Sequence, residues 1–149
     1  MNKEIKYAVV IPAYNPDEKF VSFIEILRKN GIFVIVIDDG SKAECSSYFT
    51  AAEQYGCVVL HHDRNRGKGQ ALRTGFAELI RLNEKGAGLE YAVTADCDGQ
   101  HRYDAIKAVV QAAADHKLIA AGALQGCGRL NRKPSGTCTD YRRTLSGQR

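Results

Sequence analysis

The chain has 149 residues, of which 44% are hydrophobic and 26% charged, so it is long enough for one domain with a sizeable core and has an ordinary globular composition. The net charge of +4 is misleading, because the 24 residues after position 125 hold five Arg and one Lys against one Asp and leave −1 for residues 1–125. This distribution does not indicate a basic domain surface for nucleic acid. No apolar run approaches the roughly 20 residues of a membrane span.

The cysteines indicate a reducing compartment. There are five, widely scattered and without a C-x-x-C pair, which favours free thiols over a disulfide framework. The N-terminal residues lead into a strand-like run without the apolar stretch of a signal peptide. We therefore expect a cytoplasmic protein.

Strand-like and helix-like patterns alternate along the first 116 residues. Short apolar, β-branched runs predict strands over residues 7–11, 32–37, 57–60 and 91–94. Apolar residues spaced by three and four predict helices over residues 19–29, 43–55, 70–83 and 103–116. Because strand and helix alternate with connections long enough for crossovers, we predict an α/β fold with a mostly parallel sheet and helices on both faces.

The alternating pattern stops after about Ala123. The segment 126–149 contains two Leu but no Val, Ile or Phe, and such a composition cannot bury a useful core. We therefore predict a domain over residues 1–125 and a basic, disordered tail over residues 126–149.

Polar clusters follow the predicted strands, at the sheet edge where ligands of such folds bind. Residues 12–16 (PAYNP) form a stiff loop that either holds an aromatic ring against a flat ligand, such as a nucleobase, or is an ordinary turn with a packed Tyr. In residues 38–41 (DDGS), one aspartate can order the loop and the other can accept hydrogen bonds from a base or ribose. Ser41 is a suitable N-cap for the next helix, and a capped turn is the alternative reading of this cluster.

Cations precede the strongest predicted helix. Residues 64–69 (RNRGKG) place Arg, Lys and Gly near a helix N-terminus, which suits an anion. The segment matches neither a P-loop nor the dinucleotide fingerprint. Diphosphate contact and a plain solvated loop fit this pattern equally well.

The fourth cluster, residues 96–101 (DCDGQH), gives the strongest indication of a functional site. In an extended chain Asp96 and Asp98 point the same way, and two like charges so close are unfavourable unless a cation or hydrogen-bond donors offset them. A hard divalent ion that also holds phosphates suits this pair, and Gln100 and His101 could extend its coordination shell. Cys97 is expected to point to the opposite face from the two aspartates and to pack there rather than take part in chemistry. The alternative is a turn with helix-capping carboxylates.

Four segments together resemble family-2 glycosyltransferases, and the dolichyl-phosphate mannose synthase-like branch most of all. They are residues 9–15 (VVIPAYN), 36–41 (VIDDGS), 66–76 (RGKGQALRTGF) and 96–101 (DCDGQH). The resemblance covers about residues 6–120. It implies a Rossmann-like GT-A fold, a nucleotide-diphospho-sugar donor, a Mg²⁺ or Mn²⁺ ion, and transfer with inversion at the anomeric carbon.

The resemblance also implies roles for individual residues. Asp39 would bind the base, and Asp96 and Asp98 would form the D-x-D pair that binds ribose and metal. The implied nucleotide-binding set is Pro12, Ala13, Tyr14, Asp39, Lys68 and Asp96. The implied metal-binding set is Asp96, Asp98 and Gln100. No catalytic base can be assigned.

The C-terminal part of the chain departs from the family. Family members continue beyond the fourth helix with an acceptor-side region, whereas residues 126–149 look like an out-of-frame extension. We therefore expect the part that binds the sugar donor to be present and the GT-A sheet to be incomplete toward its C-terminal part.

These observations together predict a glycosyltransferase that takes sugar from a UDP- or GDP-sugar. Its acceptor would be a lipid phosphate or a growing polysaccharide, and it would lie in the cytoplasm or at the inner face of the membrane. The first alternative is a nucleotide-sugar-binding fragment without transferase activity. The others are a phosphoacceptor receiver domain, which also carries paired aspartates at a sheet edge, and nucleic-acid binding through the tail.

Overall fold

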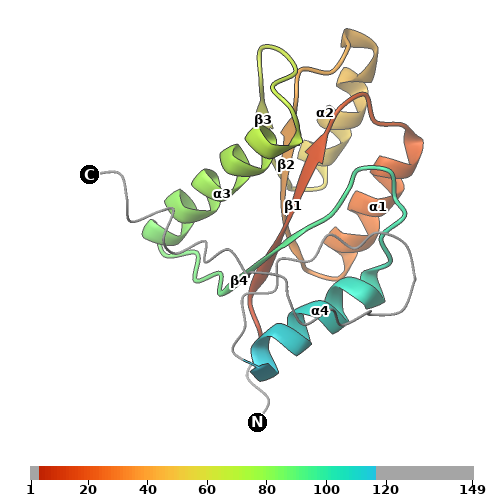
Figure 1. The fold of residues 1–149 in the computed structure, drawn as a ribbon. Helices are drawn as coiled ribbons and strands as arrows, with labels where there is room; N and C mark the ends of the chain where they lie inside the picture. Colours follow the sequence, from red (N-terminus) through yellow and green to blue (C-terminus); the bar gives the residue numbers. More distant parts are fainter. Residues whose placement is uncertain (1–3, 117–149) are drawn as a thin grey trace, which may run out of the picture.

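A computed structural model of the chain describes residues 4–116, in which four strands form one parallel sheet (Figure 1). The strands are β1 (Tyr7–Ala13), β2 (Phe33–Asp38), β3 (Val58–His61) and β4 (Tyr91–Thr94). Their order across the sheet is β3-β2-β1-β4, and every neighbouring pair is parallel. The predicted α/β fold with a parallel sheet is confirmed.

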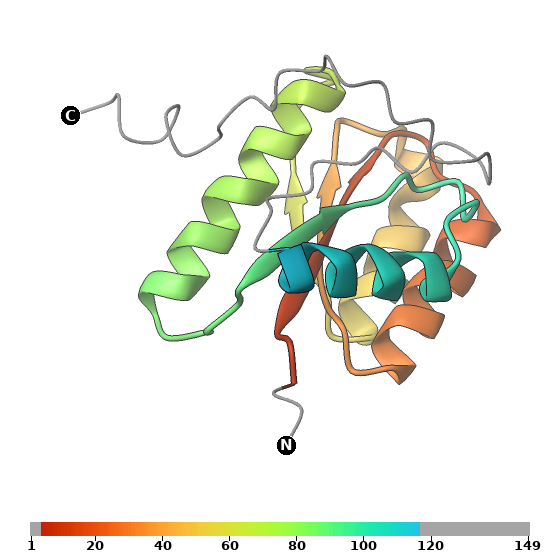
Figure 2. The ribbon, with the colours of Figure 1, turned by 60° about the horizontal axis from the view of Figure 1, so that its bottom comes forward.

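Helices cover both faces of this sheet, as predicted (Figures 1 and 2). The helical segments are α1 (Glu18–Lys29), the 3₁₀ turn η1 (Ala43–Cys45), α2 (Ser46–Gln54), α3 (Lys68–Glu84) and α4 (Tyr103–His116). Apolar side chains of α1, α2 and α4 share one buried cluster with the sheet, whereas α3 packs on the opposite face.

The central strands are apolar at nearly every position because both of their faces are buried. In β1, Val9 and Ile11 face α1 and Val10 faces α3, and all three are fully buried. In β2, Val36 and Ile37 divide between the two faces in the same way. A continuous apolar run in the sequence therefore corresponds to a strand covered from both sides.

Strand β1 continues through Pro12, where the sequence pattern predicted an end at Ile11. Proline cannot donate a ladder hydrogen bond and is normally kept out of central strands. On the β4 side, however, the last backbone bond runs from the Ala95 N–H to the Val10 carbonyl. Beyond it β1 pairs only with β2, through Ala13, whose carbonyl accepts from the Asp39 N–H. Pro12 faces the side where β4 has already ended, so its missing donor costs nothing.

Helix α3 lies unusually close to the sheet at Gly75. A Cβ atom at this position would lie 2.5 Å from Val10 Cγ1 and 2.7 Å from Ile37 Cδ1. Only glycine allows this approach, because real Cβ atoms do not come so near to carbon. Gly75 therefore fixes how deep α3 sits, and with it the position of the neighbouring Thr74.

The other boundaries differ from the prediction by at most two residues, and those of residues 91–94 and 103–116 agree with it. The predicted helix 43–55 divides into η1 and α2, and α3 begins at Lys68, two residues before the predicted start. Among residues 4–116, no helix is both long and apolar enough to cross a bilayer. The predicted tail, residues 126–149, lies outside the described residues.

Candidate functional site at the carboxyl edge of the sheet

One cavity of about 260 Å³ collects the residues that the sequence singled out. Its lining residues come from the ends of β1, β2 and β4 and from the start of α3. They are Pro12, Ala13, Tyr14, Asp39, Asn65, Gly67, Lys68, Asp96, Cys97 and Asp98. Every predicted nucleotide-binding residue and two of the three predicted metal ligands therefore face one space, whereas Gln100 does not line it.

Asp39 organises the loop between β3 and α3. Its carboxylate accepts hydrogen bonds from the Arg66 N–H (2.8 Å), the Gly67 N–H (2.9 Å) and His62 Nδ1 (2.7 Å). Burial alone would raise the pKa of Asp39, but these three donors together hold the pKa below its usual value. Asp39 is therefore a buried carboxylate that holds the loop between β3 and α3 through two backbone N–H groups.

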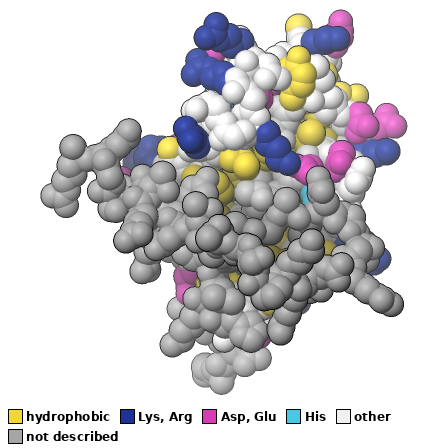
Figure 3. Space-filling view, viewed as in Figure 1, with side chains coloured by type: hydrophobic (Ala, Val, Ile, Leu, Met, Phe, Trp, Pro, Cys, Tyr) yellow, Lys and Arg dark blue, Asp and Glu magenta, His cyan; other side chains and the backbone are white. Residues whose placement is uncertain are grey.

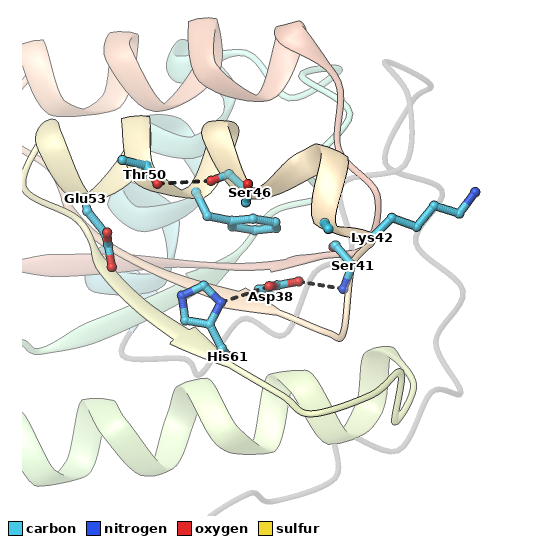
Figure 4. A pocket seen from close by; sticks show the side chains of 9 residues that line it. Asp38, Ser41, Lys42, Ser46, Thr50, Glu53 and His61 are labelled. Carbon is cyan, nitrogen blue, oxygen red and sulfur yellow. Dashed lines mark hydrogen bonds and ion pairs between the residues drawn. The ribbon is translucent and has the colours of Figure 1, made fainter.

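The two adjacent aspartates divide their roles differently from the prediction, in which only one ordered its loop. Asp38 accepts from the Ser41 N–H at 2.8 Å and pairs with His61 Nδ1 at 2.9 Å, beside a second cavity of about 180 Å³ (Figure 4). Both aspartates thus order loops. Of the two aspartates, only Asp39 also lines the cavity of about 260 Å³. Its carboxylate has roughly four acceptor positions, and the three hydrogen bonds above leave one of them unused.

Ser41 ties two loops together instead of capping a helix, so the predicted N-cap was wrong. Its hydroxyl accepts the Asn15 N–H at 2.9 Å, and Asn15 Oδ1 accepts the Lys42 N–H at 2.9 Å. The segment before α2 starts as the turn η1, whose N-cap Lys42 makes no side-chain cap bond. These two bonds hold the loop that carries Tyr14, and Tyr14 stays 49% exposed rather than packed.

Asp96 and Asp98 lie in the turn after β4 and are held more loosely than Asp39. Asp96 Oδ1 lies 2.5 Å from Lys68 Nζ, and its Oδ2 lies 3.6 Å from His101 Nε2. Asp98 accepts the backbone N–H of Gln100 at 3.0 Å. The hydrogen bond from Lys68 is the main reason that the pKa of Asp96 is lowered. The charge of Asp96 is therefore offset by a lysine, whereas Asp98 is partnered by a backbone N–H.

The donor set at this turn fits part of a hard-cation site. Two carboxylates face an open cavity, which suits an Mg²⁺ or Mn²⁺ ion that keeps water and takes further oxygens from a phosphate. Within residues 4–116, no group of three or more His, Cys, Asp or Glu side chains is placed to enclose a metal. The remaining ligands would have to come from the substrate and from water.

Cys97 packs against the core cluster that includes α1, as predicted, but it lines the same cavity as Asp96 and Asp98, so the prediction that it lies on the opposite face from them was wrong. Burial raises the pKa of its thiol, which keeps it protonated and unreactive. The structure gives no chemical role to this residue.

Sequence reasoning assigned no role to His62 and Thr74, whereas Asn65 and Gly67 lie in the cluster 64–69 that it singled out. His62 bridges Asp39 and Thr74, whose Oγ1 lies 2.9 Å from His62 Nε2. The sequence offered one signal for His62, which is its place directly after a strand at the ligand-binding edge. Nothing in the sequence paired it with Thr74.

The sequence profile of glycosyl transferase family 2 matches residues 8–137 of the chain, which extends past the predicted domain end at residue 125. The chain belongs to this family. The assignment sets aside the receiver-domain alternative, because the four polar clusters fall inside the matched region.

Relatives with assigned names include two dolichyl-phosphate enzymes. The chain is 29% identical to the UDP-N-acetylglucosamine–dolichyl-phosphate N-acetylglucosaminyltransferase of Methanococcus voltae, over 69% of this chain and 45% of that protein. It is 27% identical to the dolichyl-phosphate beta-glucosyltransferase of Saccharomyces cerevisiae, over 74% and 35%. An uncharacterized protein of Methanocaldococcus jannaschii, MJ1222, is 34% identical over 69% of this chain and 40% of its own length. The chain thus spans less than half the length of these relatives.

A solved structure supports the fold. The crystal structure of 4-diphosphocytidyl-2C-methyl-D-erythritol synthase superposes with a TM-score of 0.55 at 16% identity, over 76% of this chain and 57% of that one. At this identity the likeness extends to the Rossmann-like α/β arrangement alone.

Proposed function

We propose that this chain binds the sugar donor of an inverting glycosyltransferase, a nucleotide-diphospho-sugar held with a divalent metal. The observation that carries this proposal is the convergence of Asp39, Lys68, Asp96 and Asp98 on one cavity from three separate parts of the sequence. Family membership supports the same chemistry.

The nucleoside would lie between Tyr14 and Asp39. The Tyr14 ring is exposed on a loop fixed by hydrogen bonds, so it can cover a flat base with little loss of entropy. The unused acceptor position of Asp39 can take a base N–H. Since both uracil and guanine offer such an N–H, this contact does not distinguish UDP from GDP.

The diphosphate would lie at the N-terminus of α3. Helix N-termini favour anions, and Lys68 is the first residue of this helix. Figure 3 shows Lys and Arg side chains gathered at the upper left, where Figure 1 places the loop between β3 and α3. Arg64, Arg66 and Lys68 are all exposed there. Positive side chains therefore lie near the position proposed for the leaving group, with Arg66 paired to Asp63 and Lys68 to Asp96.

Asp96 and Asp98 would hold the metal. When bound, Mg²⁺ or Mn²⁺ neutralises the negative charge that develops on the departing diphosphate. Lys68 now occupies one oxygen of Asp96. A metal at this oxygen would release the ammonium group, and the diphosphate would lie within its reach.

A lipid phosphate is the acceptor we favour, at the inner face of the membrane. Two of the named relatives act on dolichyl phosphate. A phosphate oxygen is already anionic, so its attack on the anomeric carbon does not require a general base. The neutral hydroxyl of a growing polysaccharide would need such a base.

Calorimetry with UDP and GDP, each with and without Mn²⁺, tests the proposal. We expect one nucleotide to bind wild-type protein and Mn²⁺ to tighten that binding. Asp98→Ala should abolish the Mn²⁺ effect and leave the metal-free affinity unchanged. Equal affinities with and without Mn²⁺ in both proteins would remove the carboxylate pair from the site.

A further inference from the structure

We propose that His62 and Thr74 position the loop of residues 64–68 for the sugar donor. The inference rests on the proposed function and deepens it, because it assigns the shape of the phosphate-binding loop to two residues outside the cavity. The chain of contacts runs from Thr74 in α3 through His62 to Asp39, and from Asp39 to the loop backbone.

The first step is the pairing of His62 with Asp39. A carboxylate can only accept, so Nδ1 of His62 carries the proton and donates at 2.7 Å. The His62 side chain is 7% exposed and that of Asp39 is 5% exposed. Because little water reaches this pair, the hydrogen bond has no easy substitute.

The second step fixes the other side of the imidazole ring. The Nε2 atom of His62 lies 2.9 Å from the Thr74 hydroxyl, which can donate to a ring without a proton at Nε2 or accept from one that carries it. The His62 backbone N–H also donates to the Asp38 carbonyl at 2.8 Å. The residue is thus held by β2, by Asp39 and by α3, and it cannot rotate without losing a bond.

The third step is the anchoring of Thr74 by the core. The next residue, Gly75, sets the depth of α3 against Val10 and Ile37. The position of the Thr74 hydroxyl is therefore determined by packing rather than by the site.

The fourth step leads to the sugar donor. Asp39 holds the backbone N–H groups of Arg66 and Gly67, and Lys68 follows directly. If His62 is lost, the carboxylate loses its one side-chain hydrogen-bond donor and the fixed orientation that it gives. The loop amides then lose a fixed acceptor, and the loop that must meet the diphosphate is less ordered before binding.

The neighbouring histidine provides a matched control. His61 also pairs with an aspartate, Asp38, but its side chain is 53% exposed and it lines the other cavity (Figure 4). The test set is His62→Phe, His62→Asn, Thr74→Val and His61→Asn. Asparagine keeps a hydrogen-bond donor near the place of Nδ1, and valine removes only the Thr74 hydroxyl.

Two readouts are needed, namely amide hydrogen exchange of Arg66 and Gly67 by NMR and the dissociation constants for UDP and GDP. In His62→Phe we expect exchange at both amides to accelerate about tenfold or more and the affinity for the bound nucleotide to fall about tenfold, the value of one hydrogen bond to a charged group. His62→Asn should restore most of both, and Thr74→Val should show a smaller change in the same direction. His61→Asn should change neither.

Unchanged exchange at Arg66 and Gly67 in folded His62→Phe would overturn the proposal, as would equal effects from His61→Asn. If His62→Phe does not fold, Thr74→Val decides, because wild-type exchange rates in that variant would equally overturn it. If wild-type protein binds neither nucleotide, the proposed function fails, while the exchange rates still decide whether His62 orders the loop.

Discussion

Two groups of carboxylates lie at the same edge of the sheet and are held in opposite ways. The Asp39 side chain is almost fully buried and receives three hydrogen bonds, whereas the Asp96 side chain is 37% exposed and is held mainly by one exposed lysine. A carboxylate with fixed donors shapes the protein around it. A carboxylate whose main partner is an exposed lysine can exchange that partner for a ligand.

The position of each group in the sheet explains the contrast. Asp39 follows β2, which has a neighbour on both sides, so the loops after β1 and β3 close over it. The pair Asp96 and Asp98 follows β4, which pairs only with β1 among the described strands. With a loop on one side only, fewer backbone N–H groups can reach these oxygens.

The largest expected effect comes from Gly40, next to Asp39. It has a φ of +73°, and a Cβ there would lie 2.2 Å from the backbone carbon of Arg64. Gly40→Ala should lower the free energy of unfolding by about 3 kcal/mol, because it combines backbone strain with a clash against main chain. Gly31→Ala is the matched control, since Gly31 has a φ of +71° and open space around it. It should cost about 1 kcal/mol in urea denaturation, and equal losses would mean that the loop is not fixed at Gly40.

The second prediction is that Asp39 and Asp98 affect different properties, namely stability and metal-dependent nucleotide binding. Asp39→Ala leaves two loop N–H groups without their acceptor and should destabilise the fold by about 2 kcal/mol. Asp98→Ala should change stability by less than about 0.5 kcal/mol while removing the Mn²⁺ dependence of nucleotide binding. Thermal unfolding and calorimetry on both variants check this crossover. A stability loss in Asp98→Ala as large as in Asp39→Ala would contradict the proposed difference between the two groups of carboxylates.

The third prediction concerns acid. Because the pKa of Asp39 is lower in the folded state than in the unfolded chain, its contribution to stability is complete above the unfolded value of about 3.9 and is lost as pH falls through the folded value. Asp39→Asn should therefore flatten the fall of unfolding free energy below about pH 4. Urea titrations at several pH values give this slope. The wild-type slope in Asp39→Asn would assign the acid sensitivity to other carboxylates.

The smallest expected effect is at Lys68. Its pair with Asp96 is largely exposed, so Lys68→Met should change stability by less than about 1 kcal/mol. The pKa of Asp96 should rise, since the lysine hydrogen bond is what chiefly lowers it. A carbon-detected NMR titration of the Asp96 carboxyl group measures the shift. Lys29→Met, which breaks the exposed pair with Glu25, is the control and should leave Asp96 unchanged.

The sequence was sufficient to predict the layout of the site but not its internal bonding. Runs such as residues 32–37 identify a doubly covered strand, and parallel strands place the residues that follow them at a common edge. The sequence alone therefore predicts that Asp39, Lys68 and Asp96 lie close together at this edge of the sheet. Their joint position depends only on strand direction and order of connection.

The bonds between these residues could not be predicted, because they depend on distances of tenths of an ångström. His62 reaches Thr74 only because Gly75 lets α3 approach the sheet, and no periodic pattern in the sequence encodes that depth. Ser41 is a typical helix cap by residue type, yet its hydroxyl accepts the N–H of Asn15, which lies 26 positions away in the sequence. Residue type predicts hydrogen bonds to residues nearby in the sequence, whereas the partners of Ser41 and His62 lie 26 and 12 positions away.

The strand order has a consequence for folding. The cavity takes residues from position 12 to position 98 and from the ends of three strands, so no single strand–helix unit contains a binding site. A nucleotide should therefore recognise only the fully docked domain and stabilise it by mass action, by about 2.7 kcal/mol at a hundredfold excess over the dissociation constant. The rise in melting temperature on adding nucleotide would then report the completeness of the fold as well as the affinity of the site.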